Sequence, residues 1–165
     1  MLTDKTGTVA RLSVFAGGFT LAAVEQVGAG GELADCDVLN LVGALVDKSV
    51  VQRVEGEGEY RYRLLDTICG YGAEQLDHSG RSEEYARRYR DFFLHMAQRA
   101  GEEWLGDQQV EWGNRQQVEW GNRLAADFDN FRLAMNFAIA HSGDQTALRL
   151  VNGPWGAIAG QEATD

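Results

Sequence analysis

Apolar residues recur at helical spacing in the first part of the chain. Within residues 11–19, Leu12, Phe15 and Phe19 are separated by three and four positions, so they fall on one face of a helix. The segment 20–28 has a similar pattern and begins with a threonine, which can cap a helix. We therefore expect two short helices here, joined near a Gly-Gly pair.

A third helix is predicted after the glycine-rich stretch 28–36, whose composition is typical of a loop. Asp37 stands directly before an apolar run and can act as the N-cap of this helix. Because the run is apolar around most of the helix circumference, we expect the helix to be buried between neighbouring elements.

The strand pattern is clearest over residues 50–65. Two runs, SVVQRV and YRYRLL, flank the stretch EGEGE, whose glycines permit a turn, and together they predict a two-stranded β-hairpin. The second run alternates apolar positions, expected to face inward, with cationic ones, in the order Tyr60, Arg61, Tyr62, Arg63, Leu64.

A fourth helix is predicted to begin at Asp66 or Thr67 and to end at Gly80. Its expected inward-facing residues are Ile68, Tyr71 and Leu76. Three helices, a hairpin and another helix follow one another in the order of a winged helix, a helix-turn-helix core that carries a β-wing.

The remainder of the chain is predicted to be helical. One helix is capped by Ser82, a long one covers residues 107–141, and a third opens at residue 144. The buried stripe of the first is expected to comprise Tyr85, Tyr89, Phe92, Phe93 and Met96. The fold class is therefore mainly α, a winged helix followed by antiparallel helices.

Charge and composition narrow the class of protein. The 165 residues carry a net charge of −10, which repels phosphate backbones, so DNA is a possible but disfavoured partner. No apolar run approaches the ~20 residues that span a bilayer, and the first residues lack an apolar signal segment, so we expect a cytoplasmic protein without membrane contact. Cys36 and Cys69 stand far apart and are read as reduced thiols, with no metal site.

The eight-residue word QQVEWGNR occurs twice in succession, over residues 108–123. Eight residues turn a helix by about 800°, two full turns plus ~80°, so Trp112 and Trp120 do not share one stripe. We therefore interpret the repeat as a tandem duplication without a chemical role. Either one copy loops out at a glycine or, as we favour, the helix lengthens at its N-terminal end and leaves Trp112 partly exposed.

Arginines form the candidate interaction surfaces. Those of the hairpin alternate with inward residues, as in a half-exposed strand or a domain contact, and glutamates stand between them. Those of the following helix are expected to pair with acidic residues one turn earlier, Glu83 with Arg87 and Glu84 with Arg88. With the exposed tryptophan, the candidate surface residues are Arg53, Arg61, Arg63, Arg87, Arg88 and Trp112.

Four blocks of the sequence resemble successive blocks of the bacterial STAND-type regulatory ATPases: RLSVFAGGFTLAAVEQV, VLNLVGALVDKSVV, YRYRLLDTICGYGAEQL and DFDNFRLAMNFA. These are predicted-ATPase transcriptional regulators of actinobacteria with LuxR-type or SARP-type effector domains. In that family a nucleotide-binding domain is followed by a winged helix and tetratricopeptide-like repeats. The resemblance implies a winged-helix domain over 8–80 and a tetratricopeptide-like helical segment over 81–155, with flexible ends at 1–7 and 156–165.

The phosphate-binding loop of that family, G-x-x-x-x-G-K-[ST], does not occur in the sequence. We therefore expect no enzymatic activity and no cofactor, with ATP or ADP implied only for a neighbouring domain. In related switches a Met-His-Asp motif lies near the nucleotide just after the wing. Here Leu65 replaces the histidine, and Asp66 is a weak nucleotide-proximal candidate that is better explained as a helix N-cap. Cys69 stands where the family often has an arginine.

Two functions are compatible with the sequence. The first is a non-catalytic coupling and interaction module for signal transduction, a fragment of a STAND-type transcriptional regulator that contacts a protein partner or the adjacent nucleotide-binding domain. The alternative is a small winged-helix regulator that binds DNA. The third predicted helix would be its recognition helix, and it offers only Asn40 and Lys48 toward DNA, against Asp37 and Asp47.

Overall fold

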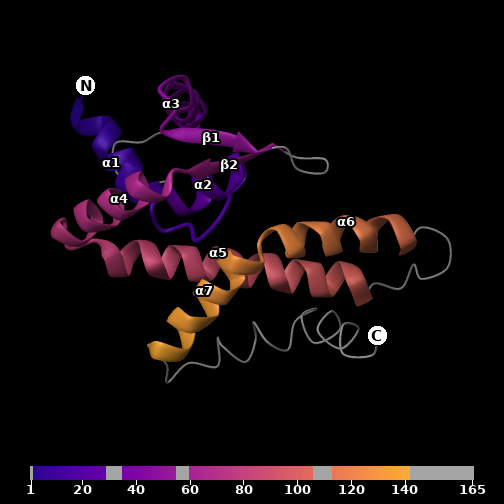
Figure 1. Cartoon of the computed structure of the whole chain (residues 1–165). Helices are drawn as coiled ribbons and strands as arrows, with labels where there is room; N and C mark the ends of the chain where they lie inside the picture. Colours follow the sequence, from indigo (N-terminus) through magenta and orange to yellow (C-terminus); the bar gives the residue numbers. More distant parts are fainter. Residues whose placement is uncertain (1, 29–34, 55–59, 106–112, 142–165) are drawn as a thin grey trace. The chain divides into compact units, whose positions relative to one another are not determined.

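The structure, a computed structural model, describes residues 2–28, 35–54, 60–105 and 113–141 (Figure 1). Side chains are described at 6–28, 38–54, 60–102 and 118–141. The elements follow one another as α1 (Leu2–Leu12), α2 (Leu21–Gly28), α3 (Asp35–Asp47), β1 (Val51–Val54), β2 (Arg61–Leu64), α4 (Asp66–His78), α5 (Ser82–Leu105), α6 (Gly113–Ala126) and α7 (Phe128–Ala140). The fold class is mainly α with one small sheet, as predicted.

The chain divides into two compact units, Met1–Tyr89 and Arg90–Asp165. The division falls inside α5, whereas the sequence placed it earlier, in the turn that precedes this helix. Unit 1 contains the predicted winged helix, and unit 2 contains the rest of α5 with α6 and α7.

The predicted hairpin of unit 1 is confirmed. β1 and β2 are antiparallel, with a register that runs from Val51 opposite Leu64 to Val54 opposite Arg61. Phe19 adds an isolated bridge to the outer edge of β2, since its N–H and C=O each form a 2.8 Å hydrogen bond with Tyr62. The sheet is thus tied to the segment between α1 and α2 as well as to the helices.

The first helix was placed incorrectly from the sequence. α1 ends at Leu12, and Phe15 and Phe19 lie in the connection to α2 rather than on the same helix. All three side chains are nevertheless buried, and the Phe15 and Phe19 rings lie 5.1 Å apart. The spacing of apolar residues therefore identified the core residues but not their backbone conformation, because the bridge to β2 favours an extended chain at Phe19. Residues 2–7, expected to be flexible, belong to α1.

α2 and α3 agree only in part with the sequence. The cap of α2 is confirmed, because the Ala23 N–H donates to the Thr20 hydroxyl oxygen at 3.2 Å. α3 begins at Asp35, so Asp37 lies inside the helix and is not its N-cap. The expected burial of α3 on most of its circumference is also wrong, since Leu39 is 58% exposed.

α4 begins at Asp66 itself, with Leu65 as the N-cap residue and no capping side chain. The interpretation of Asp66 as an N-cap is therefore wrong by one position. The stop at Gly80 is confirmed, since this residue has φ +69 after the last turn. Tyr71, expected to face inward, is 49% exposed.

α1 and α4 pack closely at one glycine. A Cβ atom on Gly72 would lie 2.8 Å from the Val9 carbonyl oxygen and 2.9 Å from the Ser13 Cβ. Beyond this contact Ala10, Leu76 and Tyr85 form a buried cluster, against which Val14 packs. Only a residue without a side chain permits this approach, and it sets the position of the end of α1.

In unit 2, α6 runs back alongside the C-terminal part of α5, and α7 follows it after a break (Figure 1). The expected single helix over 107–141 is therefore wrong. It is interrupted at Asp127, whose buried carboxylate accepts a 2.8 Å hydrogen bond from the Asn130 amide. The predicted stripe of α5 is buried at four of five positions and half-buried at Phe92.

α6 contains the whole second copy of the repeated word and the last three residues of the first. Trp120 is buried and its ring lies 5.5 Å from the Arg123 guanidinium carbon. Trp112 and the helix predicted from residue 144 lie outside the described residues.

Candidate functional site

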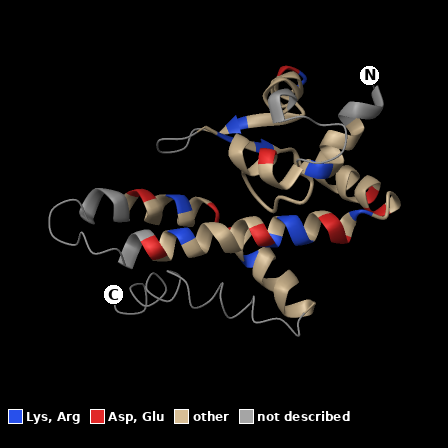
Figure 2. Ribbon diagram, turned by 180° about the vertical axis from the view of Figure 1, so that it is seen from behind, with Lys and Arg blue, Asp and Glu red and all other residues tan. Residues whose placement is uncertain are grey.

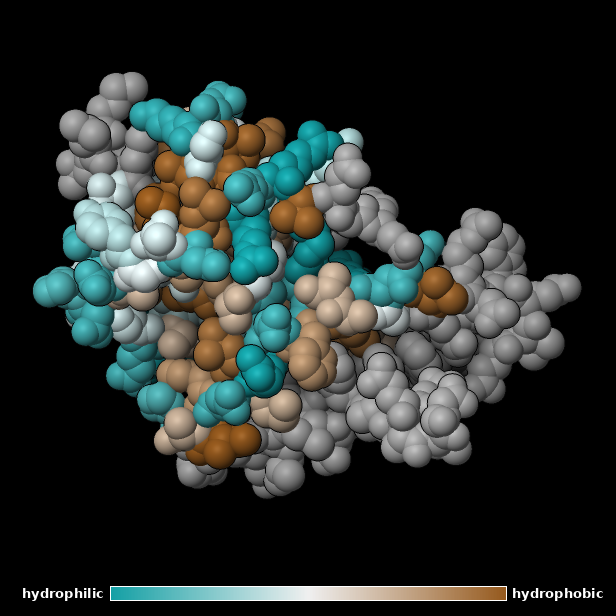
Figure 3. Space-filling model, in the orientation of Figure 1, coloured by the Kyte–Doolittle hydropathy of each residue, from teal (hydrophilic) through white to brown (hydrophobic). Residues whose placement is uncertain are grey.

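Helix α3 is the element that would enter the DNA groove in a winged helix. Its buried side consists of Val38, Val42 and Leu45. The opposite side exposes Leu39, Asn40, Gly43 and Asp47, and apolar surface is visible over α3 (Figure 3). This exposed side bears one amide and one carboxylate but no cation among the described side chains, so it is poorly suited to phosphate contact.

The turn after α3 is closed by two backbone hydrogen bonds. The Ser49 N–H donates to the Val46 carbonyl at 2.8 Å, and the Val50 N–H donates to the Leu45 carbonyl at 2.9 Å. This is the Schellman arrangement, in which the residue after the cap is left-handed, and Ser49 has φ 57. The turn leaves Lys48 exposed between the end of α3 and the start of β1.

The hairpin register distributes its arginines over two faces. Directly opposed residues share a face, so Arg53 lies with Tyr62, while Arg63 lies with Gln52 and Arg61 lies with Val54. Arg61 and Arg63 are two positions apart and share their face, which Arg53 does not. The three predicted surface arginines therefore do not form one patch.

Arg61 has a role in the fold. Its Nη2 donates a 3.0 Å hydrogen bond to the Gly18 carbonyl, and the side chain is half-buried. It thereby fixes the segment before α2 beside the bridge between Phe19 and Tyr62.

Arg53 and Arg63 are the exposed cations of the hairpin. The Arg53 guanidinium carbon lies 3.5 Å from the centre of the exposed Tyr60 ring, a cation–π contact. Arg63 contacts the Asp66 carboxylate at 3.3 Å, and the Asp66 side chain is 87% exposed. Asp66 is thus a surface residue beside the wing, paired with a cation.

The ion pairs predicted on α5 are confirmed. Arg87 lies 3.6 Å from Glu83, and Arg88 lies 2.8 Å from Glu84. Positive and negative residues alternate along this helix (Figure 2). The structure adds a contact from Arg81, which reaches both carboxylate oxygens of Glu84, at 2.9 and 3.2 Å.

Arg11, which the sequence did not single out, also belongs to this group. Its guanidinium carbon lies 5.8 Å from the Tyr85 ring centre, and the corresponding distances for Arg81 and Arg88 are 5.0 and 5.4 Å. No local sequence signal joins Arg11 to α5, because the two are separated by the length of the winged helix.

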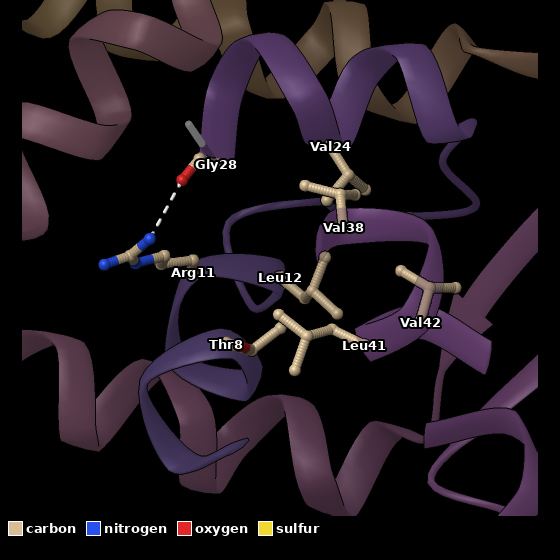
Figure 4. A pocket seen from close by; sticks show the side chains of 8 residues that line it. All are labelled: Thr8, Arg11, Leu12, Val24, Gly28, Val38, Leu41 and Val42. Atoms are coloured by element: carbon tan, nitrogen blue, oxygen red, sulfur yellow. Dashed lines mark hydrogen bonds between the residues drawn. The ribbon is translucent and has the colours of Figure 1, made fainter. Parts of the chain in front are cut away.

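A cavity of about 10 Å³ lies where α1, α2 and α3 meet (Figure 4). It is lined almost entirely by apolar atoms, and Arg11 at its rim donates a 3.2 Å hydrogen bond to the Gly28 carbonyl. This volume holds about one water molecule, so the cavity is a packing defect rather than a ligand site.

Other candidate chemistry is limited. Burial first, and then the charge of Asp66, raises the pKa of the half-buried Cys69 thiol, which makes it a weak nucleophile. In the part of the chain that the structure describes, no three metal-ligating side chains come together. Among those same residues, no helix has both the length and the apolar character needed to cross a membrane.

The sequence was compared with known proteins. Residues 3–77 match the family described as the winged helix-turn-helix domain. An 87-residue segment is 45% identical to a protein named "Putative HTH-type transcriptional regulator" in Mycobacterium bovis and to one of the same name in Mycobacterium tuberculosis. An 81-residue segment is 40% identical to an uncharacterized protein of Mycobacterium tuberculosis. No solved structure matches.

The matched segments are short relative to these relatives. The first covers 53% of this chain and 10% of the regulators, and the second covers 48% of this chain and 21% of the uncharacterized protein. Residues 3–77, which match the family, contain α2, α3 and the hairpin, with nearly all of α1 and α4. Residues 3–77 are thus a winged helix-turn-helix domain, and the chain is homologous over 87 residues to mycobacterial proteins named as HTH-type transcriptional regulators.

Proposed function

We propose that this chain acts in transcription regulation and that its winged helix-turn-helix domain contacts DNA. The observation that carries the proposal is the match of residues 3–77 to the winged helix-turn-helix family, together with 45% identity over 87 residues to proteins named as HTH-type transcriptional regulators. The expectation that favoured a coupling module over a DNA-binding regulator has less support from these relatives.

The exposed side chains indicate which part of the domain would meet the duplex. Lys48 follows α3, and Arg53 and Gln52 are exposed on the hairpin. Because the described solvent face of α3 has no cation, the contacts would go mainly to phosphates through the wing and the end of α3. Such binding depends strongly on salt and discriminates weakly between base sequences.

A titration of the full chain with duplex DNA at several salt concentrations tests this function. In the Lys48→Ala/Arg53→Ala double variant we expect weaker binding and a salt slope lower by about 2, since each lost phosphate contact removes ~0.9. Arg87→Ala, which removes an ion-paired cation of α5, is the control and should leave both quantities unchanged. Equal salt slopes for the wild type, the double variant and the Arg87→Ala control would contradict the proposed contact surface.

A second function, favoured by the exposed Leu39, is that of a coupling module within a STAND-type regulator. In this proposal the apolar side of α3 packs on an adjacent nucleotide-binding domain, and α5 to α7 begin a tetratricopeptide-like array. Asp66, beside the wing, would then lie toward the nucleotide. The protein would be cytoplasmic, and ATP or ADP would bind only to the adjacent domain.

Leu39→Lys separates the two functions. It places a cation on the solvent face of α3, where a DNA-facing helix would gain a phosphate contact and bind duplex more tightly. If α3 instead faces a protein domain, the substitution leaves DNA binding at the same low level. Absence of duplex binding by the wild type near physiological salt would contradict the first function and leave the second.

A further inference from the structure

One side of α3 is left uncovered by the described part of unit 1, at whose edge this helix lies (Figure 1). The buried side of the helix packs against α2 and β1. The uncovered side is formed by four exposed residues, Leu39, Asn40, Gly43 and Asp47. Because each residue turns a helix by about 100°, these four lie within an arc of about 100° and form one continuous surface. We call this surface the α3 face.

The α3 face is better suited to the edges of bases than to phosphates. Its described side chains include no cation, and its one anion, Asp47, is the last residue of the helix. Base edges are bound by side-chain amides and by apolar groups, which Asn40 and Leu39 supply in the second turn of α3. In a helix-turn-helix the N-terminal part of this helix contacts the bases, so Leu39 and Asn40 are placed to do so and Asp47 is not.

Gly43, at the centre of the α3 face, lets a partner approach the helix backbone closely. A Cβ atom on this residue would meet no atom within 4 Å beyond its chain neighbours and the backbone of its own helix. The packing of the domain therefore does not require a glycine here, and glycine weakens a helix relative to alanine. A glycine at this position is explained if another surface comes close to α3.

We propose that the α3 face recognises A·T base pairs in the major groove and that Asn40 sets this specificity. The inference rests on the DNA contact proposed above for the winged helix. Adenine presents an acceptor at N7 and a donor at N6, which match the donor and the acceptor of the Asn40 amide. The thymine of the same pair presents a methyl group, which Leu39 would contact. Guanine presents two acceptors instead, so the Asn40 carbonyl oxygen would face another acceptor.

Three duplexes of equal length test the proposal, each in alternating sequence and made only of A·T, only of G·C or only of inosine·cytosine pairs. Inosine is guanosine without the N2 amine, so its pair resembles G·C in the major groove and A·T in the minor groove. We expect the full chain at constant salt to bind the A·T duplex about tenfold more tightly than the other two, since one bidentate contact gives discrimination of this order. If the inosine duplex binds as A·T does, the preference arises in the minor groove and the proposal is overturned.

Asn40→Ala should abolish the preference and bind all three duplexes as the wild type binds G·C. Gln98→Ala removes an exposed amide of α5, outside residues 3–77, and as the matched control should keep the preference of the wild type. If Asn40→Ala also keeps it, the proposal is overturned. Deoxyuridine in place of thymine removes only the methyl group, so it should weaken binding by the wild type several-fold and leave binding by Leu39→Ala unchanged. Equal binding of both duplexes by the wild type would overturn the role of Leu39.

Gly43→Leu tests the close approach to α3 without removing a polar group. The new side chain enters open space and favours the helix, so we expect the domain to remain folded, which circular dichroism establishes. Binding to the A·T duplex should fall about tenfold, to the level of G·C, because the longer side chain holds Asn40 away from the bases. Gly70→Leu, at an exposed glycine of α4 with the same open space, is the control and should bind as the wild type does. Equal affinities of the two variants would overturn the proposal.

The same titrations separate failure of this inference from failure of the proposed function. If the wild type binds none of the three duplexes near physiological salt, both are overturned. If it binds all three equally and in a salt-dependent manner, the DNA contact stands and the recognition of A·T pairs by α3 is overturned.

Discussion

The hairpin carries three arginines that lie on two faces, whereas at the start of α5 Arg81 and Arg88 contact the same carboxylate. In the hairpin the strand period of two places Arg53 on one face and Arg61 and Arg63 on the other. On α5 the separation of Arg81 from Arg88 is two helical turns, so both reach Glu84 between them. A similar number of cations therefore gives a dispersed surface on a strand pair and a focused one on a helix.

The largest expected effect comes from the contact that brings Arg11 to α5. Gly72→Ala would place a Cβ 2.8 Å from the backbone oxygen of Val9, which cannot move without shifting α1. We expect a loss of about 1–3 kcal/mol in the free energy of unfolding, typical of overpacking. Urea denaturation measures it.

Gly70→Ala is the matched control for Gly72→Ala. It lies in the same helix, and an added Cβ there would meet no atom within 4 Å beyond its chain neighbours and the backbone of its own helix. Its effect should be neutral or stabilising by up to ~1 kcal/mol, because alanine favours a helix. Equal destabilisation by both substitutions would contradict the close packing of α1 on α4.

The next largest effect is expected at the hairpin, where substitutions of Arg61 and Arg63 should differ in their cost to stability. Arg61→Ala removes a hydrogen bond to the Gly18 carbonyl from a half-buried side chain, which costs about 1 kcal/mol. Arg63→Ala removes an exposed ion pair with Asp66 and should change stability by less than ~0.5 kcal/mol. If thermal denaturation shows the two variants to be equally stable, Arg61 does not fix the segment before α2.

A smaller effect is expected at the turn that presents the hairpin to α3. Ser49 has φ 57, so Ser49→Gly should stabilise the domain by roughly 0.5–1 kcal/mol. Ser79→Gly is the counterpart at the end of α4, where φ is −75 and glycine brings no relief. The midpoint of chemical denaturation should therefore rise for Ser49→Gly. For Ser79→Gly it should stay the same or fall.

The smallest effect concerns the ion pairs of Glu84 with Arg81 and Arg88. Because the pKa of Glu84 is lower in the folded than in the unfolded protein, its pairing stabilises the fold above the unfolded pKa. This contribution is lost as the pH falls through the folded pKa. The stability difference between wild type and Glu84→Gln, at most a few tenths of a kcal/mol for such exposed pairs, should shrink from neutral pH to about pH 3. A difference that grows in acid would contradict this sign.

Much of unit 1 could be predicted because its patterns are local. The alternation from Tyr60 to Leu64 specified a strand pair, and the hydroxyl of Thr20 specified the start of α2. Leu12, Phe15 and Phe19 were correctly assigned to the core, but a helical spacing did not establish that they share a helix. The bridge from Phe19 to Tyr62 joins residues far apart in the chain, which a local pattern does not contain.

The candidate surfaces were harder to predict because they also depend on contacts between residues that are far apart in the chain. The pair of Glu84 and Arg88 follows from helical spacing, whereas the position of Arg11 beside Tyr85 follows from the packing of α1 on α4. In unit 2 the apolar period continues through Asp127, but the backbone there has φ −102 and ψ 13, which are not helical values and which the spacing of apolar residues does not reveal.

The exposed side of α3 has a consequence for how the sequence can change with time. Val38, Val42 and Leu45 are held apolar by the interior of the domain, so their substitution rates should be low in every homologue. At Leu39 and Gly43 the domain itself imposes no such restraint, since one is 58% exposed and the other has open space around it. Slow substitution at these two positions in homologues would therefore record selection by whatever molecule meets this helix, and drift there would mean that nothing does.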